Sequence, residues 1–245
     1  MSVATDALLF GAGLIAGALN AIAGGGTLVT FPALLAAGLP PLVANATSSL
    51  AQWPGYLASG YAMRRELAAS RAVLPGLAVA SLAGGVVGGV LASVVSAALF
   101  MRLVPWLILM ATLLFWAAPR LARPGGGQWP RTPLLACQLM VAVYGGFFGG
   151  GMGVMMLALY ALALPGGLLV AGALKNGLSV LIASGGVAAF IAAGLIDWRA
   201  GAVTVAGTVA GGVAGVALAR RLPVIWLRRF VVALGLVLTL VFFLR

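Results

Sequence analysis

The sequence predicts an all-α integral membrane protein made of two repeats, each with four to five transmembrane or half-membrane helices. Hydrophobic residues make up 63% of the 245 positions and charged residues only 7%, whereas soluble domains carry about 25% charged residues. The 14 basic and 3 acidic residues gather in short clusters with long uncharged runs between them. Such runs are typical of spanning helices. Glycine-rich motifs also recur along the chain, which indicates the repeat.

The apolar segments follow one another in two series of five. The first series is 7–23, 27–39, 43–63, 72–99 and 103–118. The second series is 134–148, 152–164, 168–196, 200–219 and 230–244. A linker rich in proline, glycine and arginine separates them, so we divide the chain into a first repeat (1–118), a cytoplasmic linker (119–133) and a second repeat (134–245).

Matching motifs stand at a nearly constant offset in the two halves. The triplet Gly24, Gly25, Gly26 matches Gly149, Gly150, Gly151. Further along, "AGGVVGGVLA" from Ala83 matches "AGGVAGVALA" from Ala210. Single glycines coincide by chance in membrane helices, but ordered matches along both halves predict two copies of one unit.

The arginine clusters predict the orientation of the chain. The three basic loops are "MRRELAASR", "PRLARPGGGQWPR" and "RRLPVIWLRR", and cytoplasmic loops carry the excess of Lys and Arg. The loop after Leu99, with Arg102, and the loop "IDWR" then lie outside. Corresponding loops of the two halves fall on opposite sides, so we expect the repeats to be inverted.

The glycine triplets predict breaks near the middle of the membrane. A segment such as 27–39 forms a helix of about 20 Å, too short for a hydrocarbon core of about 30 Å. Half-helices that start after Gly26 and Gly151 would point unpaired N–H groups at one central point, where an anion binds favourably. The alternative is that glycines only permit close helix packing, and we favour this for the motifs at Ala83 and Ala210.

A polar cluster forms the second candidate part of the site. "ANATSS" at 44–49 aligns with "AGALKN" at 171–176. Burying the charge of Lys175 in an uncharged stretch costs a few kcal/mol, which favours a role in balancing an anion. The alternative is an ammonium that reaches the membrane interface. The neighbouring polar side chains either donate to an oxyanion or link helices; they are Asn45, Thr47, Ser48, Ser49 and Asn176.

These residues carry a resemblance to a known family. "NAIAGGGTLVTFPALLAAGLPPLVANATSSLAQWPGYLASGY" and, later, "GGFFGGGMGVMML" with "GALKNGLSVLIASGGVAAFIAAGLIDW" resemble the two signature regions of the TauE/SafE family of sulfite-exporter-like permeases. The resemblance implies a multi-pass permease of the bacterial inner membrane for sulfur oxyanions or organosulfonates such as sulfite or sulfoacetate. The implied substrate-binding residues are Gly24, Gly25, Gly26, Asn45, Thr47, Ser48, Gly149, Gly150, Gly151, Lys175 and Asn176. The second copy lacks the Thr-Ser pair, so the implied site is not symmetric.

The absence of several residue types narrows the function. The chain has no histidine, and Asp6, Glu66 and Asp197 all fall at segment ends. The sequence therefore offers no catalytic acid–base pair, triad or metal cluster, and we expect neither an enzyme nor a cofactor. The net charge of +11 comes from arginines beside membrane segments, so the expected partners are a small anion and the bilayer, not nucleic acid.

The predicted activity is export of a small anion. An inside-negative potential drives a monoanion outward by about 2.3 kcal/mol per 100 mV, so export needs no coupled ion. Symport of a proton on a protonated substrate is the fallback. Two other functions stay open from the sequence, an anion channel and a membrane assembly factor that transports nothing. The oligomeric state is also open.

Overall fold

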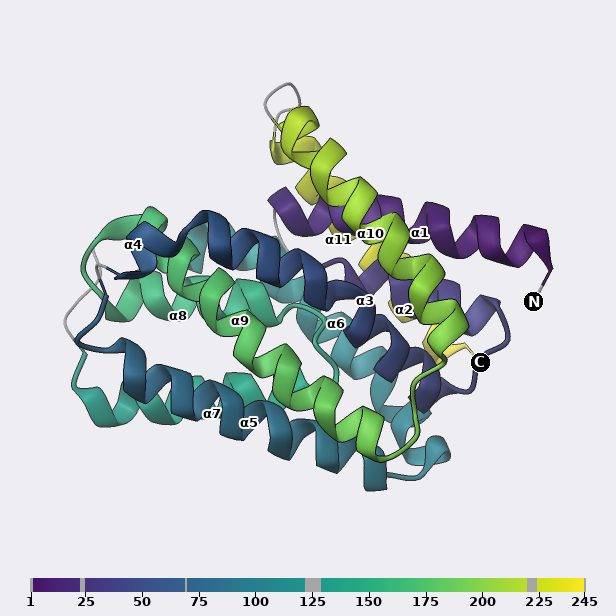
Figure 1. Ribbon diagram of the computed structural model, residues 1–245, viewed down its shortest axis with the longest axis horizontal. Coiled ribbons are helices and arrows are strands. Elements are labelled where there is room, and N and C mark those ends of the chain that lie inside the picture. Colours follow the sequence, from purple (N-terminus) through teal and green to yellow (C-terminus); the bar gives the residue numbers. More distant parts are fainter. Residues whose placement is uncertain (1, 23–24, 69, 122–128, 220–223, 245) are drawn as a thin grey trace.

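Helices are the only regular elements in the part of the chain that the computed structural model describes, residues 2–22, 25–68, 70–121, 129–219 and 224–244 (Figure 1). The first half forms α1 (Val3–Ile22), α2 (Thr27–Ala36), α3 (Pro41–Ala62), α4 (Arg64–Ala68), α5 (Leu74–Val94) and α6 (Ala97–Leu121). The second half forms α7 (Arg131–Phe147), α8 (Met152–Ala163), α9 (Gly167–Ala192), α10 (Trp198–Ala219) and α11 (Val224–Phe243). The predicted all-α class is therefore confirmed.

Four helices in the described ranges are long and apolar enough to cross a bilayer. Their apolar windows are Val3–Asn20, Leu74–Val94, Ala97–Leu114 and Leu169–Ala192. Large apolar side chains are exposed on these helices, for example Phe10 on α1, Val79 on α5 and Trp106 on α6. Exposed contiguous apolar surface of this kind suits contact with lipid.

One helix agrees with the sequence prediction and one turn differs from it. The segment predicted at 43–63 is one continuous helix, α3, which the polar cluster and Pro54 do not interrupt. The turn expected after Leu99 lies earlier, between Val94 and Ala97, so Arg102 belongs to α6 and not to a loop. The physical reason is a cap: the Ser96 hydroxyl accepts a hydrogen bond from the Leu99 N–H at 3.3 Å, which satisfies a free donor at the start of α6.

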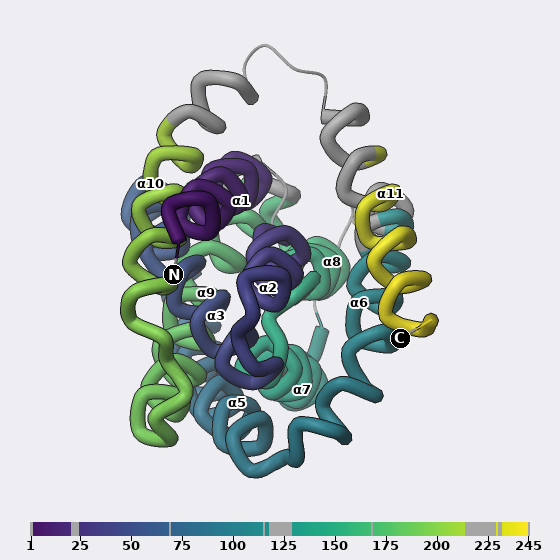
Figure 2. Tube along the Cα trace, turned by 90° about the vertical axis from the view of Figure 1, so that its right-hand side faces the viewer, coloured from purple at the N-terminus to yellow at the C-terminus, as the bar shows by residue number. Residues whose placement is uncertain are grey.

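The two helices after the glycine triplets are short, as predicted. α2 has 10 residues and α8 has 12, or about 15 and 18 Å at 1.5 Å per residue. Neither can cross a hydrocarbon core of about 30 Å. Figure 2 shows both near the centre of the molecule, with α1 and α10 to one side and α6 and α11 to the other.

Glycines bring two long helix pairs into close contact, α1 with α10 and α5 with α7. Gly84 on α5 lies so near α7 that a Cβ there would be 2.9 Å from the Leu139 carbonyl oxygen. Gly211 on α10 lies even closer to the Leu14 carbonyl oxygen on α1. Small residues permit such approach in membrane helices, so the packing interpretation of both glycine motifs is confirmed at these positions.

Contacts between helices also give their directions. On α3 and α9, the Trp53 Nε1–H donates to Ser184 Oγ at 2.9 Å, while Gly60 faces Gly177, so these two helices run antiparallel. On α1 and α10, Gly13 faces Thr204 and Gly17 faces Thr208, so these two run parallel. The contacts of α5 with α7 also follow a parallel course.

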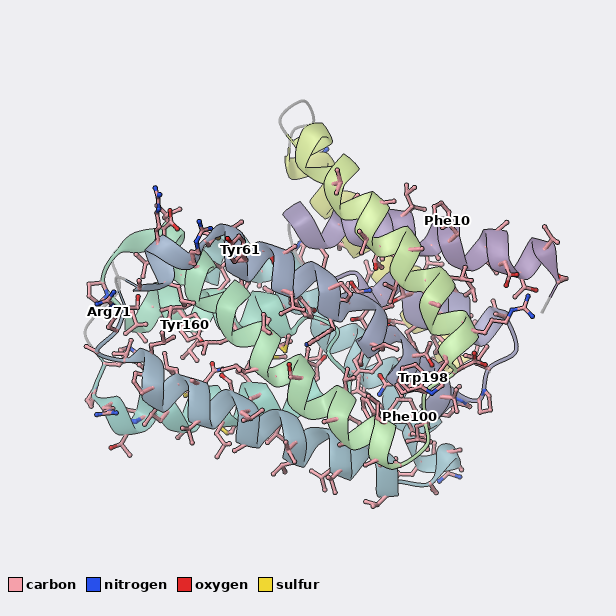
Figure 3. The ribbon with its side chains drawn as sticks, in the orientation of Figure 1. Phe10, Tyr61, Arg71, Phe100, Tyr160 and Trp198 are labelled. Atoms are coloured by element: carbon pink, nitrogen blue, oxygen red, sulfur yellow. The ribbon has the colours of Figure 1, made fainter. Side chains whose placement is uncertain are left out.

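Charged side chains lie at both ends of the molecule. Figure 3 shows Arg71 at one end and, at the other, Phe100 and Trp198, the residue before Arg199. The start of α5, which follows Arg71, lies beside the start of α7, because a Cβ on Gly76 would be 3.3 Å from the Arg131 guanidinium. The first residue of α7 therefore lies at the same end as Arg71. At the opposite end, Arg199 pairs with Asp6 at 3.0 Å.

Candidate functional site

The two glycine breaks face each other in the middle of the fold. A Cβ at Gly149 would lie 3.7 Å from Thr27 Oγ1, and one at Gly150 would lie 3.7 Å from Leu28 Cδ2. The starts of α8 and α2 are therefore neighbours. The backbone turns with φ of +100° at Gly25, +77° at Gly149 and +80° at Gly151, which glycine adopts readily and L side chains rarely do.

The first turn of α8 presents unpaired donors. Within the described residues, the backbone N–H groups of Gly150, Gly151 and Gly153 make no hydrogen bond. The Gly150 carbonyl is held by the hydroxyl of Tyr144 on α7, which donates to it. A helix start with free N–H groups carries partial positive charge and favours an anion.

A small pocket lies beside these breaks. Its wall is mostly apolar and comes from α2, α3, α7, α8 and α9, and it includes Gly149 and Met152 at the second break. Four of its side chains are polar, namely Thr27, Ser49, Gln52 and Tyr56. An apolar pocket with a few placed polar groups is the usual form of a small-molecule site.

A chain of hydrogen bonds fixes the polar wall on the side of the first break. Asn20 Nδ2 donates to Gln52 Oε1 at 2.9 Å, and Gln52 Nε2 donates to Thr30 Oγ1 at 3.1 Å. Thr30 in turn shares a 2.6 Å hydrogen bond with the Ser48 hydroxyl. These hydrogen bonds link α1, α2 and α3, and they determine that the Gln52 oxygen faces Asn20 and its nitrogen faces Thr30.

The sequence prediction missed Gln52 and Thr30. Gln52 is 2% exposed and Thr30 is fully buried. The available signal was an amide within an apolar helical run, because a buried amide is costly unless it is hydrogen-bonded.

The predicted glycines have different surroundings. Gly24 lies outside the described residues. Gly25, Gly149, Gly150 and Gly151 lie at the two breaks. Gly26, also at the first break, is buried, and a Cβ there would meet Gln52 Oε1 at 2.5 Å.

Two of the predicted hydroxyl residues bond within the protein. Thr47 Oγ1 accepts a hydrogen bond from the Asp197 N–H at 3.1 Å, which joins α3 to the turn before α10. Ser48 bonds Thr30. Both side chains are fully buried, so the geometry favours the helix-linking interpretation over contact with a ligand.

Lys175 and Asn176 are neighbours in sequence but face different parts of the fold. Lys175 Cδ lies 3.5 Å from the position of a Cβ on Gly153, so this side chain reaches the first turn of α8. Asn176 Nδ2 instead donates to the sulfur of Met63, at the end of α3, at 3.1 Å. The structure thus brings the lysine, and not the asparagine, to a glycine break.

Asn45 occupies the junction of α3 with the end of α7. Its side chain is fully buried, and its Nδ2 donates to the Phe147 carbonyl at 2.9 Å. One turn further along α3, the hydroxyl of the pocket residue Ser49 donates to the Asn45 carbonyl at 3.0 Å.

Comparison with known proteins gives consistent matches over nearly the whole chain. The family described as Sulfite exporter TauE/SafE matches residues 9–242. A "Probable membrane transporter protein" of Haemophilus influenzae is 30% identical over 237 residues, 95% of this chain and 92% of its own length. A "Probable membrane transporter protein ORF9" of a Sinorhizobium species is 32% identical over 217 residues, 85% of this chain and 81% of its own. A "Probable membrane transporter protein YfcA" of Escherichia coli K12 is 30% identical over 207 residues, 83% of this chain and 77% of its own. No solved structure matches.

Proposed function

Because the chain belongs to the TauE/SafE family, we propose that it is a permease that exports a small anion, a sulfur oxyanion or organosulfonate, across the bacterial inner membrane. The family and the names of its relatives indicate a membrane transporter. The class of cargo, the direction and the membrane are our inference from the site and the charge distribution.

One observation carries the proposal: the two half-helix starts meet beside a pocket, and the start of α8 offers unpaired N–H groups. Broken backbone inside a membrane persists only where protein or a polar cavity satisfies it. Donors of this kind, without an acidic side chain near them, suit an anion. Within the described residues the acidic side chains are Asp6, Glu66 and Asp197, and all three lie at helix ends.

Lys175 adds a full positive charge to the same place. It is the only lysine in the chain, and its side chain reaches the first turn of α8. A cation beside a helix N-terminus is unfavourable by itself, because both carry positive charge. An anion between them would turn this repulsion into two attractions. We therefore retain Lys175, with Gly149, Gly150 and Gly151, as substrate-binding residues.

We further propose that the halves are inverted repeats that share the site. Three features support this. α3 and α9, which correspond in the two halves, run antiparallel. α1 pairs with α10 as α7 pairs with α5. Gly84 faces Leu139 just as its counterpart Gly211 faces Leu14. Each half then contributes one broken helix to a site near the midplane.

The charges at the two ends support an orientation and a direction. The end with Arg64, Arg65 and Arg71 carries an excess of basic residues, which is typical of the cytoplasmic side. From that side, an inside-negative potential moves a monoanion outward without a coupled ion.

A flux assay in proteoliposomes tests the proposal. Purified protein is reconstituted, a potassium-diffusion potential is imposed without a pH gradient, and flux of sulfite, thiosulfate, sulfoacetate and simple carboxylates is followed. We expect saturable flux of at least one sulfur anion that increases with the potential. Flux of no anion in the panel would contradict the permease. Flux that ignores voltage but follows a pH gradient would contradict uncoupled export and favour proton symport, and flux without saturation or competition would favour a channel.

A further inference from the structure

The side-chain oxygen of Asn45 is a buried acceptor without a donor. Asn45 is 0% exposed, and its Oδ1 has no hydrogen-bond partner among the described residues. A buried polar atom left unpaired is costly and rare in folded proteins. A side chain that keeps such an atom at a candidate site points to a ligand that supplies the missing donor.

The orientation of the Asn45 amide follows from its partner. The Phe147 carbonyl oxygen can only accept a hydrogen bond, so the nitrogen of the amide must face it, at 2.9 Å. The oxygen therefore cannot be the atom bonded there, and reversing the amide would set two acceptors against each other.

Neighbours of this amide on three helices line the pocket, although Asn45 itself does not. Ser49, one turn along α3, lines the pocket and bonds the Asn45 carbonyl. Gly146, adjacent to Phe147 on α7, lines it as well. Phe190 of α9 lines it too, and packs in one cluster with Ala46, the residue after Asn45. Asn45 precedes Ser49 and Gln52 on one face of α3, so its amide lies one turn beyond the wall that these two residues form.

Two kinds of groups then lie at or beside the pocket. The first turn of α8 offers N–H donors, which suit a negatively charged oxygen. Asn45 Oδ1 on α3, buried next to the end of α7, suits a hydrogen-bond donor. Only three residues, 148–150, separate the end of α7 from the N-cap of α8, so both groups border the same short turn.

We propose that Asn45 Oδ1 accepts a hydrogen bond from the cargo, so that the preferred substrate is an anion that also carries a donor. The class comprises protonated sulfur oxyanions and sulfonates with a hydroxyl or amino group. This inference rests on the proposed permease function and narrows its substrate. A site built to bond a donor rejects the analogue that lacks it, because the buried acceptor is then left unpaired.

Two sulfonates that differ by one hydroxyl group test the inference. Isethionate (2-hydroxyethanesulfonate) and ethanesulfonate are compared for their own flux and as competitors of sulfite flux in the same proteoliposomes. We expect isethionate to be about tenfold or more the better substrate or competitor. Asn45→Ala should reduce this ratio to near one, while Gln138→Ala, which removes a buried amide bonded to Ser81 away from the pocket, should leave it unchanged.

The outcomes separate this inference from the proposed function. If the two sulfonates move or compete equally, or neither does while sulfite moves, the acceptor role of Asn45 is wrong and the permease stands. Equal rates that require Na⁺ would assign the free oxygen to a cation and also overturn the inference. Absence of flux for every anion would refute the permease itself. If Asn45→Ala fails to insert, the wild-type ratio alone decides.

Discussion

The two glycine breaks each precede a short helix, but different contacts stabilise them. At the first break, a hydrogen-bonded chain of side chains from α1, α2 and α3 surrounds Gly26, with Gln52 at its centre. At the second break, two glycines with positive φ shape the turn and the Tyr144 hydroxyl holds the Gly150 carbonyl. The comparison teaches that both breaks use glycines with positive φ, Gly25 at the first and Gly149 and Gly151 at the second, but only the first adds a network of side chains from three helices, so their sensitivities to mutation should differ.

The largest expected effect concerns charge, which only the second break has. Lys175→Met should abolish flux in the assay above, while the protein inserts and elutes as the wild type does. The reason is loss of the cation at the first turn of α8. Arg102→Met, which removes an exposed charge from α6, is the control and should retain flux. Wild-type flux from a folded Lys175→Met protein would remove this residue from the site.

Gly151→Ala should have the next largest effect. Its φ of +80° strains any L residue, and the new Cβ would lie 2.8 Å from Ala111 Cβ and 3.0 Å from Ala111 Cα. Strain of this kind costs about 1–3 kcal/mol, so we expect a lower melting temperature and at least a tenfold loss of flux. Gly11→Ala, with nothing within 4 Å of its Cβ, should be close to neutral. Equal effects from both would show that the second break does not depend on backbone conformation.

Gln52→Leu tests the first break. The change leaves Asn20 and Thr30 without their amide partner, and unpaired buried groups cost about 1–3 kcal/mol. Gln138→Leu is a matched control, because Gln138 is buried and bonds Ser81 at 2.8 Å and Tyr160 at 2.6 Å, away from the pocket. Both variants should lose stability, but only Gln52→Leu should raise the KM of transport, by about tenfold. The same KM change in both would contradict a specific role for Gln52.

Tyr144→Phe should have the smallest effect of the series. It removes one hydroxyl that donates to the Gly150 carbonyl, and a net hydrogen bond contributes about 1 kcal/mol. We expect flux to fall severalfold with little change in insertion. Tyr160→Phe removes a buried hydroxyl bonded to Gln138 and should leave flux of the folded protein unchanged. If the two variants behave alike, Tyr144 acts on stability only.

Local rules were enough to predict the breaks. A glycine triplet followed by a short apolar segment indicates a half-helix, and α2 and α8 begin at Thr27 and Met152, right after their triplets. The close-packed glycine motifs were recognised by the same kind of rule, since small residues at helical spacing face neighbouring helices.

Long-range partners decide what local rules could not. Thr47 resembles a ligand residue in sequence, but its partner is Asp197, 150 positions away. Gln52 becomes part of the site because α2 folds back onto α3, which brings Thr30 to its amide. The orientation of the Asn45 amide is set by the Phe147 carbonyl, 102 positions later. The spacing of neighbouring residues in the sequence does not predict any of these pairings.

The contact of α1 with α10 has a consequence for synthesis and membrane insertion of the protein. α1 leaves the ribosome before its partner α10, which emerges only when residues 198–219 have been made. At about 5–20 residues per second, α1 waits in the bilayer for roughly 10–40 s. During that interval the face with Gly13 and Gly17 meets lipid and has no partner helix. The pairing of α1 with α10 thus comes only after the helices between them in the sequence have been made.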